Sequence, residues 1–68
     1  VNIWEYANTR PKIKLRTKNG DVCIGYTYMV WDSEETDDNE DSISIELPGG
    51  EIKSFYQSEI EAIERMPQ

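Results

Sequence analysis

The sequence predicts a mainly β fold, a strongly bent five-stranded small barrel behind a short N-terminal helix. Three observations predict it. Apolar and polar residues alternate with a period of two over several short runs. Turn-forming residues separate these runs, as at Asn19-Gly20 and Pro48-Gly49-Gly50. A chain of 68 residues has room for one domain, here 1–68, with one modest core. Closing the sheet would remove its exposed edges.

Residues 1–9 are predicted to form the helix. Asn2 can cap it, Glu5 three residues later can reach back to the cap, and Pro11 prevents continuation. The apolar side of this helix is formed by Ile3, Trp4, Tyr6 and Ala7. Because so short a helix is unstable alone, we expect it to lie on one end of the barrel.

The first two strands are predicted on either side of Asn19-Gly20, a strong hairpin signal. In the first strand, Ile13 and Leu15 alternate with basic residues. The second strand is long and apolar on both faces, with Val22, Ile24, Tyr26, Tyr28 and Val30 on one and Cys23, Gly25, Thr27, Met29 and Trp31 on the other. Such a strand, with Gly25 inside it, is typical of a sharp bend shared between two halves of a barrel.

The second half of the chain predicts three further strands. Residues 42–47 alternate, with Ile43, Ile45 and Leu47 as the apolar set, and residues 51–57 follow the glycine turn. Ser58 and Glu61 have capping-box spacing, which indicates a single helical turn before a last strand near Ile63. A helix through the C-terminus is the competing interpretation, since Ile60 and Ile63 lie three residues apart.

The acidic loop, residues 32–41, dominates the charge pattern. The net charge is -7, with +3 over residues 1–31 and -10 over residues 32–68. An extended, solvated loop is the favoured interpretation. The alternatives are a docking site for a basic partner and a calcium loop. For calcium, Asp37, Asn39 and Asp41 alternate, but Ser42 and Pro48 stand where the loop needs Gly and Glu.

A basic stripe precedes the hairpin turn, with a cation at every second position. Its members are Arg10, Lys12, Lys14, Arg16 and Lys18. The favoured interpretation is the polar face of an amphipathic strand, and the alternative is a row for phosphates or an acidic protein. Because the whole chain is acidic, general nucleic-acid binding is disfavoured.

Two segments resemble the Sm-like (LSm) family, whose fold is an N-terminal helix followed by a strongly bent five-stranded SH3-like barrel. The first is IKLRTKNGDVCIGYTYMVWD, in which Gly20 and Gly25 stand five apart and Trp31-Asp32 matches an aromatic or apolar residue followed by Asp. The second is SFYQSEIEAIE, which is similar to the closing motif through Ile60 and Ile63.

The resemblance implies an RNA site at Trp31, Asp32, Tyr56 and Gln57, which stand near the positions where relatives hold a base. RNA-binding members carry an Asn soon after the Asp and an Arg-Gly pair before the closing isoleucines. Here the acidic loop replaces the first, and Tyr56-Gln57 replaces the second. Single-stranded RNA binding is therefore the alternative function, and a protein-interaction module is the preferred one.

The resemblance also implies self-association, because such barrels form rings by pairing the fourth strand of one copy with the fifth of the next. Here IKSFY would meet the segment around EAIER. The edge residues expected at this contact are Ile52, Ser54, Tyr56, Ala62 and Glu64. We therefore expect a homo-oligomer, with a further protein partner as an open alternative.

Catalysis is not expected. With no His, the chain lacks an ordinary nucleophile and base pair and the usual zinc ligands, and no cofactor motif occurs.

The single Cys23, expected to be a small buried residue, has no intrachain disulfide partner, which fits a reducing compartment. No apolar run is long enough to cross a membrane. We therefore expect a cytoplasmic protein without membrane attachment. Most aromatic residues of the strands are expected to be core or subunit contacts, and Trp31 and Tyr56, next to loops, are expected to be the exposed ones; the set is Tyr26, Tyr28, Trp31, Phe55 and Tyr56.

Overall fold

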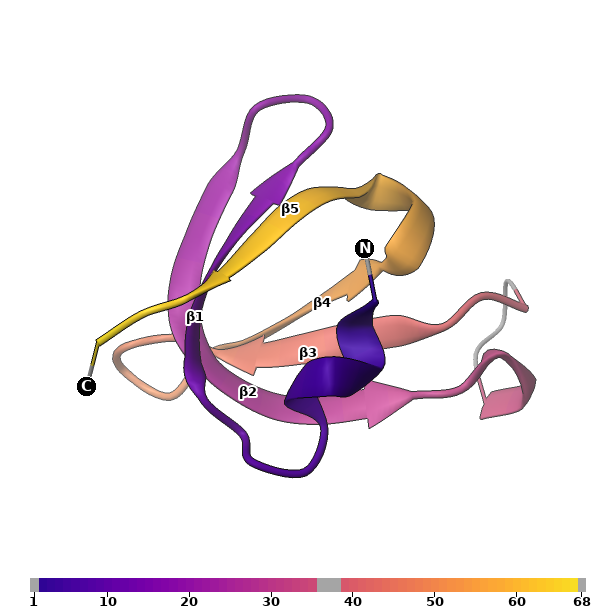
Figure 1. The fold of residues 1–68 in the computed structure, drawn as a ribbon, viewed down its shortest axis with the longest axis horizontal. Helices are drawn as coiled ribbons and strands as arrows, with labels where there is room; N and C mark the ends of the chain where they lie inside the picture. Colours follow the sequence, from indigo (N-terminus) through magenta and orange to yellow (C-terminus); the bar gives the residue numbers. More distant parts are fainter. Residues whose placement is uncertain (1, 36–38, 68) are drawn as a thin grey trace.

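A computed structural model describes residues 2–35 and 39–67 of the chain. It contains five strands and three 3₁₀ turns, coloured along the chain in Figure 1. The strands are β1 (Lys12–Thr17), β2 (Val22–Trp31), β3 (Ser42–Glu46), β4 (Ile52–Tyr56) and β5 (Ile60–Arg65). The 3₁₀ turns are η1 (Ile3–Tyr6), η2 (Ser33–Glu35) and η3 (Gln57–Glu59). The predicted mainly β fold is therefore confirmed.

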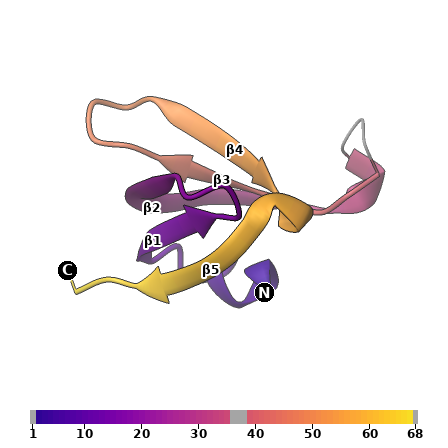
Figure 2. The same ribbon diagram turned by 90° about the horizontal axis from the view of Figure 1, so that it is seen from above.

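The five strands form one antiparallel sheet in the order β4-β3-β2-β1-β5. Strands β4 and β5 are its two edges, and among the described residues no strand pairing joins them to close a barrel. Figure 2 shows how β4 and β5 diverge from η3, the short turn that links them. The sheet is thus bent so that its two edges meet only at this corner.

The core lies on one face of the sheet, which we call the inner face. Seven apolar side chains are buried there, Ile3, Tyr6, Ile13, Leu15, Ile43, Ile45 and Ile60, with Val30, Leu47, Phe55 and Ile63 packed against them. The alternation of β1 is confirmed: Ile13 and Leu15 are fully buried, while Lys12, Lys14 and Arg16 point to the opposite, outer face. Burial of these apolar side chains is the main stabilising contribution in so small a domain.

The expected helix over residues 1–9 is a single 3₁₀ turn. The Asn2 side chain caps η1 as predicted, accepting the Trp4 N–H at 3.1 Å. Ile3 and Tyr6 enter the core, and Arg65 of β5 holds the turn by donating to the Glu5 carbonyl at 3.1 Å and lying over the Tyr6 ring. One helical turn suffices because tertiary contacts, and not helix propensity, hold it.

Strand β2 contains a β-bulge between Thr27 and Met29 in its pairing with β3. The bulge shifts the alternation by one, so Val30 packs against the core while Tyr26 on the same predicted face is exposed. The predicted grouping of these two residues on one face is therefore wrong. Cys23, expected to be buried, is half-buried. Gly25 is needed inside the strand, because an added Cβ would lie 2.7 Å from Ile45 Cγ2 and closer still to the Glu46 carbonyl oxygen.

The turn before the last strand is confirmed, and the alternative of a C-terminal helix is wrong. Its cap differs from the expected one: the Tyr56 N–H donates to Glu59 Oε1 at 2.9 Å, so the capping pair is Tyr56 with Glu59 instead of Ser58 with Glu61. The turn therefore begins two residues earlier than predicted. It is short because Ile60 must enter the core at once and pair with Thr17 of β1.

Candidate functional site

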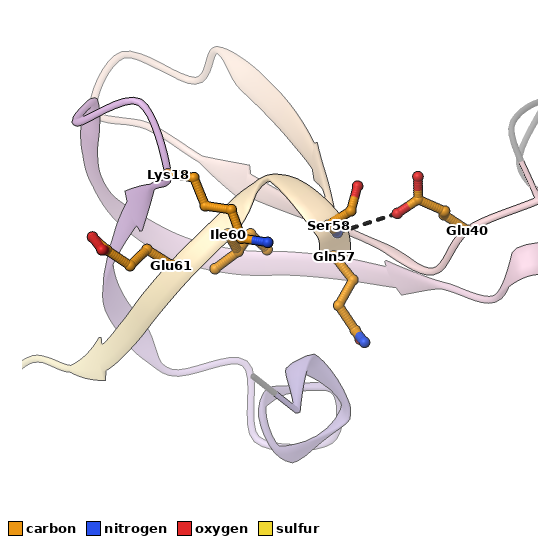
Figure 3. A pocket seen from close by; sticks show the side chains of 6 residues that line it. All are labelled: Lys18, Glu40, Gln57, Ser58, Ile60 and Glu61. Atoms are coloured by element: carbon orange, nitrogen blue, oxygen red, sulfur yellow. Dashed lines mark hydrogen bonds between the residues drawn. The ribbon is translucent and has the colours of Figure 1, made fainter.

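A groove lies at the corner where η3, the start of β3 and the β1–β2 hairpin meet. Its volume is about 680 Å³, and it is lined by Lys18, Glu40, Gln57, Ser58, Ile60 and Glu61. Figure 3 shows the Lys18 side chain reaching over β5 towards the η3 turn, with Glu61 on one side and Glu40 on the other. The groove is larger than three other pockets of the described surface, whose volumes are about 230, 350 and 320 Å³.

Hydrogen bonds donated by backbone N–H groups hold the three walls of this groove together. The Gln57 N–H donates to the Asp41 carbonyl at 2.9 Å, and the Ser58 N–H donates to Glu40 Oε1 at 3.1 Å. On the other side, the Lys18 N–H donates to the Glu59 carbonyl at 2.9 Å. These bonds fix the corner because each joins segments far apart in the sequence.

The groove is polar, with one ammonium group and two carboxylates around an apolar floor. The floor is Ile60, which is 3% exposed, whereas Lys18 and Glu61 are exposed at the rim. Two carboxylates against one cation disfavour a phosphate group here. The arrangement suits a ligand that donates hydrogen bonds, such as the backbone or amino group of a peptide.

Of the four predicted RNA-site residues, three do not line this groove. Only Gln57 lines the groove. The Asp32 carboxylate accepts the Glu34 N–H at 2.7 Å and shapes the start of η2. Trp31 and Tyr56 are half-buried, although they were expected to be the exposed aromatic residues.

Trp31 and Tyr56 nevertheless share one face of the sheet. In the register, Trp31 pairs with Ser42, and Ser42 pairs with Tyr56, so the two aromatic residues flank one buried serine on the outer face. The Trp31 indole N–H donates to Ser44 Oγ at 3.0 Å, which holds its ring against the sheet. The ring faces are thus partly used in packing.

The predicted edge residues fall on the two edge strands and on one face. Ile52, Ser54 and Tyr56 alternate along β4, and Ala62 and Glu64 along β5. All of them point to the outer face, because their partners in the register are the outer-face residues of β3 and β1. Ile52 is 42% exposed, and Ala62 is half-buried.

Only three of the five residues of the basic stripe lie in one row on the outer face. Lys12, Lys14 and Arg16 occupy the outer face of β1, where Arg16 forms an ion pair with Glu61 at 2.9 Å. Arg10 leaves the row: its φ is +50°, its guanidinium donates to the Thr27 carbonyl at 3.3 Å and lies over the Tyr28 ring. Lys18 follows the strand and turns into the groove.

Three residues of the acidic loop take part in structural hydrogen bonds instead of only being solvated. Asp32, Glu40 and Asp41 each accept a backbone N–H. Asp37, on which the calcium interpretation depends, lies outside the described residues. Within residues 2–35 and 39–67, no group of three or more carboxylate or thiolate side chains could hold a metal ion. No helix in that part of the chain is long and apolar enough to cross a membrane.

Sequence reasoning missed Lys18, Glu40 and Ser58 as groove residues. The signal that could have found them is topological. If β5 pairs with β1, the residue after β1 must lie beside the turn before β5, which brings Lys18 to η3.

Comparisons of this chain with protein-family models, curated proteins and solved structures find no match. The geometry of the chain itself therefore carries the functional argument.

Proposed function

We propose that this chain is a non-catalytic, Sm-like interaction module that self-associates by pairing β4 of one copy with β5 of the next. One observation carries the proposal: β4 and β5 are the two edges of a single sheet, and each has a neighbouring strand on one side only within the described residues. Edge strands present rows of backbone donors and acceptors that readily pair with another chain.

The bend of the sheet supports the head-to-tail arrangement. Strands β4 and β5 run in different directions away from η3 (Figure 2), so they do not pair within one copy. In the proposed assembly, a neighbouring copy supplies the strand that closes the Sm-like barrel. The contact would be heterologous, and repeated contacts of this kind close into a ring when the rotation allows it.

The side chains on both edges suit such a contact. On the outer face, Ser54 lies in the middle of β4, and Ala62 and Glu64 lie along β5. Side chains of paired strands project from the two faces of the sheet, so Ser54 and its partner on β5 would lie side by side on the outer face. Because a slip of one residue would reverse the faces, Ser54 must meet an outer-face residue of β5.

Disulfide trapping tests this proposal in a Cys23→Ser background, so that the only thiols are introduced ones. Ser54→Cys is placed in one preparation, and Ala62→Cys or Glu64→Cys in a second that carries a mass tag. Directly opposite residues in paired strands place their Cβ atoms about 4.5–5.5 Å apart, close to what a disulfide accepts. We expect mixed preparations to form tagged–untagged dimers on mild oxidation, and a chain carrying both thiols to form a ladder of linked oligomers.

Each single variant alone is the matched control. Dimers of equal yield in the single-variant preparations would indicate an isologous or random contact and would contradict head-to-tail pairing. In the doubly substituted chain, an intramolecular disulfide would give a monomer that migrates faster on a gel. Such a monomer would mean that β4 and β5 pair within one copy. Light scattering on the unmodified chain provides the accompanying measurement, since a strict monomer at every concentration would also contradict the proposal.

Single-stranded RNA binding is the second candidate, and one observation favours it: Trp31 and Tyr56 flank Ser42 on one face, as a base-stacking pair would. The carboxylates of Glu40 and Glu61 oppose it, because they line the nearby groove. Titration with U-rich and A-rich oligonucleotides at low salt separates the two functions. Binding that is lost in Tyr56→Ala would favour RNA binding as the function. No binding signal at any salt concentration would exclude that function.

A cytoplasmic location belongs to the same proposal. Its support is the single cysteine of the chain, Cys23, which is free and half-buried and has no second thiol to pair with. Chains that depend on oxidising compartments usually carry cysteines in pairs. The expression of a tagged chain in cells, followed by fractionation, would test the location directly.

A further inference from the structure

The outer face of β2 carries an apolar row that nothing in the described structure covers. Val22, Ile24 and Tyr26, which we call the outer stripe, are 49%, 40% and 47% exposed. They alternate with half-buried Cys23 and buried Gly25, so all three point away from the core. Strand β2 lies between β1 and β3 in the strand order (Figure 1). Tyr26 has a partner on both sides, whereas Ile24 and Val22 pair only with Lys14 and Arg16 of β1.

An antiparallel sheet with one solvated face normally carries polar residues there. Strand β1 follows this rule with Lys12, Lys14 and Arg16, whereas the adjacent β2 does not. As many large apolar side chains are exposed as are buried in the described part of the chain; the exposed ones are Trp4, Val22, Ile24, Tyr26, Tyr28, Met29 and Ile52. Five of these seven belong to β2. Exposed apolar side chains gathered on one strand in this way mark an interaction surface.

Charges on the two sides of the stripe have opposite sign. Tyr26 pairs with Lys12 on β1 and with Glu46 on β3, so these three residues form one row across the outer face. The cation lies on one side of the tyrosine and the carboxylate on the other. Glu46 is exposed and Lys12 half-exposed, so both can reach a facing surface.

This pattern is complementary to itself under one symmetry operation. When two sheets pack face to face about a two-fold axis parallel to β2, β1 of one copy faces β3 of the other. Lys12 then meets Glu46 of the second copy, and Glu46 meets its Lys12. With the axis perpendicular to β2, β1 would face β1, and the cations Lys12, Lys14 and Arg16 would oppose one another. The charges therefore select the parallel axis.

We propose that the outer stripe is the centre of a two-fold dimer in which the outer faces of two copies pack with their strands aligned. Tyr26, Ile24 and Val22 meet their symmetry mates along the axis, and two Lys12–Glu46 pairs flank them. Aligned face-to-face packing is an ordinary solution for sheets, with the mean strand directions within about 30° of each other. Because the sheet curls around its core, the outer face is convex, and contact is limited to β2 and its two neighbours.

This dimer is independent of the edge pairing proposed above. It uses side chains on the sheet face, while the edge contact uses the backbone of β4 and β5. The two contacts can therefore coexist, and the face dimer would join two edge-paired assemblies back to back. Substitutions at Lys12 and Glu46 leave both edges unchanged, which makes the two proposals separately testable.

Charge reversal and its rescue test the dimer. Glu46→Lys places two cations against each other at each of the two symmetric contacts, and Lys12→Glu places two carboxylates there. Each reversal is expected to raise the dimer dissociation constant at least about tenfold at low salt, since close interfacial charge pairs couple by more than about 1.4 kcal/mol. The double variant Lys12→Glu with Glu46→Lys restores opposite charges at both contacts and should dimerise like the unmodified chain. Sedimentation over a concentration series provides the measurement.

Glu51→Lys is the matched control for Glu46→Lys, because it makes the same change in net charge at an exposed position in the β3–β4 turn. It should leave the dissociation constant within about threefold of the unmodified chain. Circular dichroism confirms that each variant is folded before its association is compared. The proposal would be overturned if the double variant dimerised as weakly as the single variants, or if neither reversal changed the dimer dissociation constant.

Tyr26→Ser supplies a second readout that does not involve charge. It removes the largest apolar side chain of the stripe from a position that is 47% exposed, so the folded monomer should lose little stability. The dimer should weaken strongly, because aromatic residues at the centre of an interface carry much of its binding free energy. Unchanged dimerisation of this variant would also overturn the proposal.

Discussion

The indole N–H of Trp4 donates to Asp41 Oδ2 at 2.9 Å, across 37 positions of the sequence. The other carboxylate oxygen of Asp41 accepts the Ser33 N–H at 2.9 Å, and its carbonyl accepts the Gln57 N–H at 2.9 Å. One residue of the acidic loop therefore joins η1, η2 and η3. The last acid of that loop is a structural tie and not simply a solvated charge.

Replacement of Asp41 by Ala should destabilise the fold by about 1–2 kcal/mol, because two N–H donors lose a charged acceptor and must turn to water. Urea denaturation followed by circular dichroism measures the change. Glu34→Ala removes the same charge from an exposed position of the same loop and serves as control, with an expected effect within about 0.5 kcal/mol. Equal effects of the two variants would mean that the tie contributes nothing to stability.

Gly25→Ala should be the most damaging single-methyl change in the sheet. The added Cβ would meet the Glu46 carbonyl oxygen and the Ile45 side chain, and the backbone atom cannot move without breaking the β2–β3 pairing. We expect a loss of about 2–4 kcal/mol, the range for overpacking with backbone displacement. Thermal unfolding measures it, and a variant with unchanged Tm would contradict the close approach of β2 and β3 at this position.

Gly50→Ala is the comparison for this prediction. The position has φ of +91° with nothing within 4 Å of an added Cβ, so only the left-handed backbone is penalised. A cost of about 1 kcal/mol is expected. The difference between the two glycine variants isolates the steric effect from the conformational one.

The fold could be predicted to the level of its strands because local signals agree with each other. The period of two around Ile13 and Leu15, the Asn19-Gly20 turn, and the glycine turn after Leu47 each depend on a few neighbouring residues. Gly20, Gly49 and Gly50 all adopt positive φ, as turn residues chosen for that purpose do. The five strands follow from these signals.

The faces of β2 could not be predicted beyond Thr27, because a bulge leaves no mark in the sequence pattern. The apolar row from Val22 to Val30 reads as one continuous face, yet the extra residue at the bulge sends Val30 to the core. The bulge depends on pairing with β3, a long-range contact. The same limitation explains why Arg10 left the basic stripe: its side chain follows the Thr27 carbonyl and the Tyr28 ring.

The candidate groove could not be predicted from spacing, since its walls come from three separate segments. Gln57 was singled out through the family resemblance, and it does line the groove. Lys18 and Glu40 were each assigned to a charge pattern, the basic stripe and the acidic loop, in which no single member stands out. Their positions depend on two long-range hydrogen bonds at η3, from the Lys18 N–H to the Glu59 carbonyl and from the Ser58 N–H to the Glu40 carboxylate.

Glu59→Ala should loosen the turn that sets the angle between β4 and β5. The Glu59 carboxylate accepts the Tyr56 N–H at 2.9 Å, which is the cap of η3. Loss of such a cap costs about 0.5–2 kcal/mol. Glu51→Ala, an exposed glutamate in another turn, is the control and should change the free energy of unfolding by less than about 0.5 kcal/mol. Hydrogen exchange at the Tyr56 amide gives a local readout, and unchanged protection there would argue against the cap.

Ser44 should matter more than Ser54, although their hydroxyl groups lie 2.7 Å apart. Ser44 is 3% exposed and also accepts the Trp31 indole N–H at 3.0 Å, whereas Ser54 is exposed on the β4 edge. Ser44→Ala therefore leaves two partners without their bond in a place that water reaches poorly, and should cost about 1–2 kcal/mol. Ser54→Ala leaves the Ser44 hydroxyl still bonded to the Trp31 indole N–H, so only one bond is lost, and the cost should be smaller, about 0.5 kcal/mol.

A double-mutant cycle of Ser44→Ala with Trp31→Phe separates the hydrogen bond from ring packing. Trp31→Phe removes the indole donor and some packing area, so its single effect mixes both contributions. In the Ser44→Ala background the bond is already absent, and only the packing loss remains. The two substitutions should therefore be less than additive by about 0.5–1.5 kcal/mol in urea denaturation followed by circular dichroism. Strict additivity would mean that the Trp31 ring is held by packing alone, and it would free the indole for contact with a ligand or a second chain.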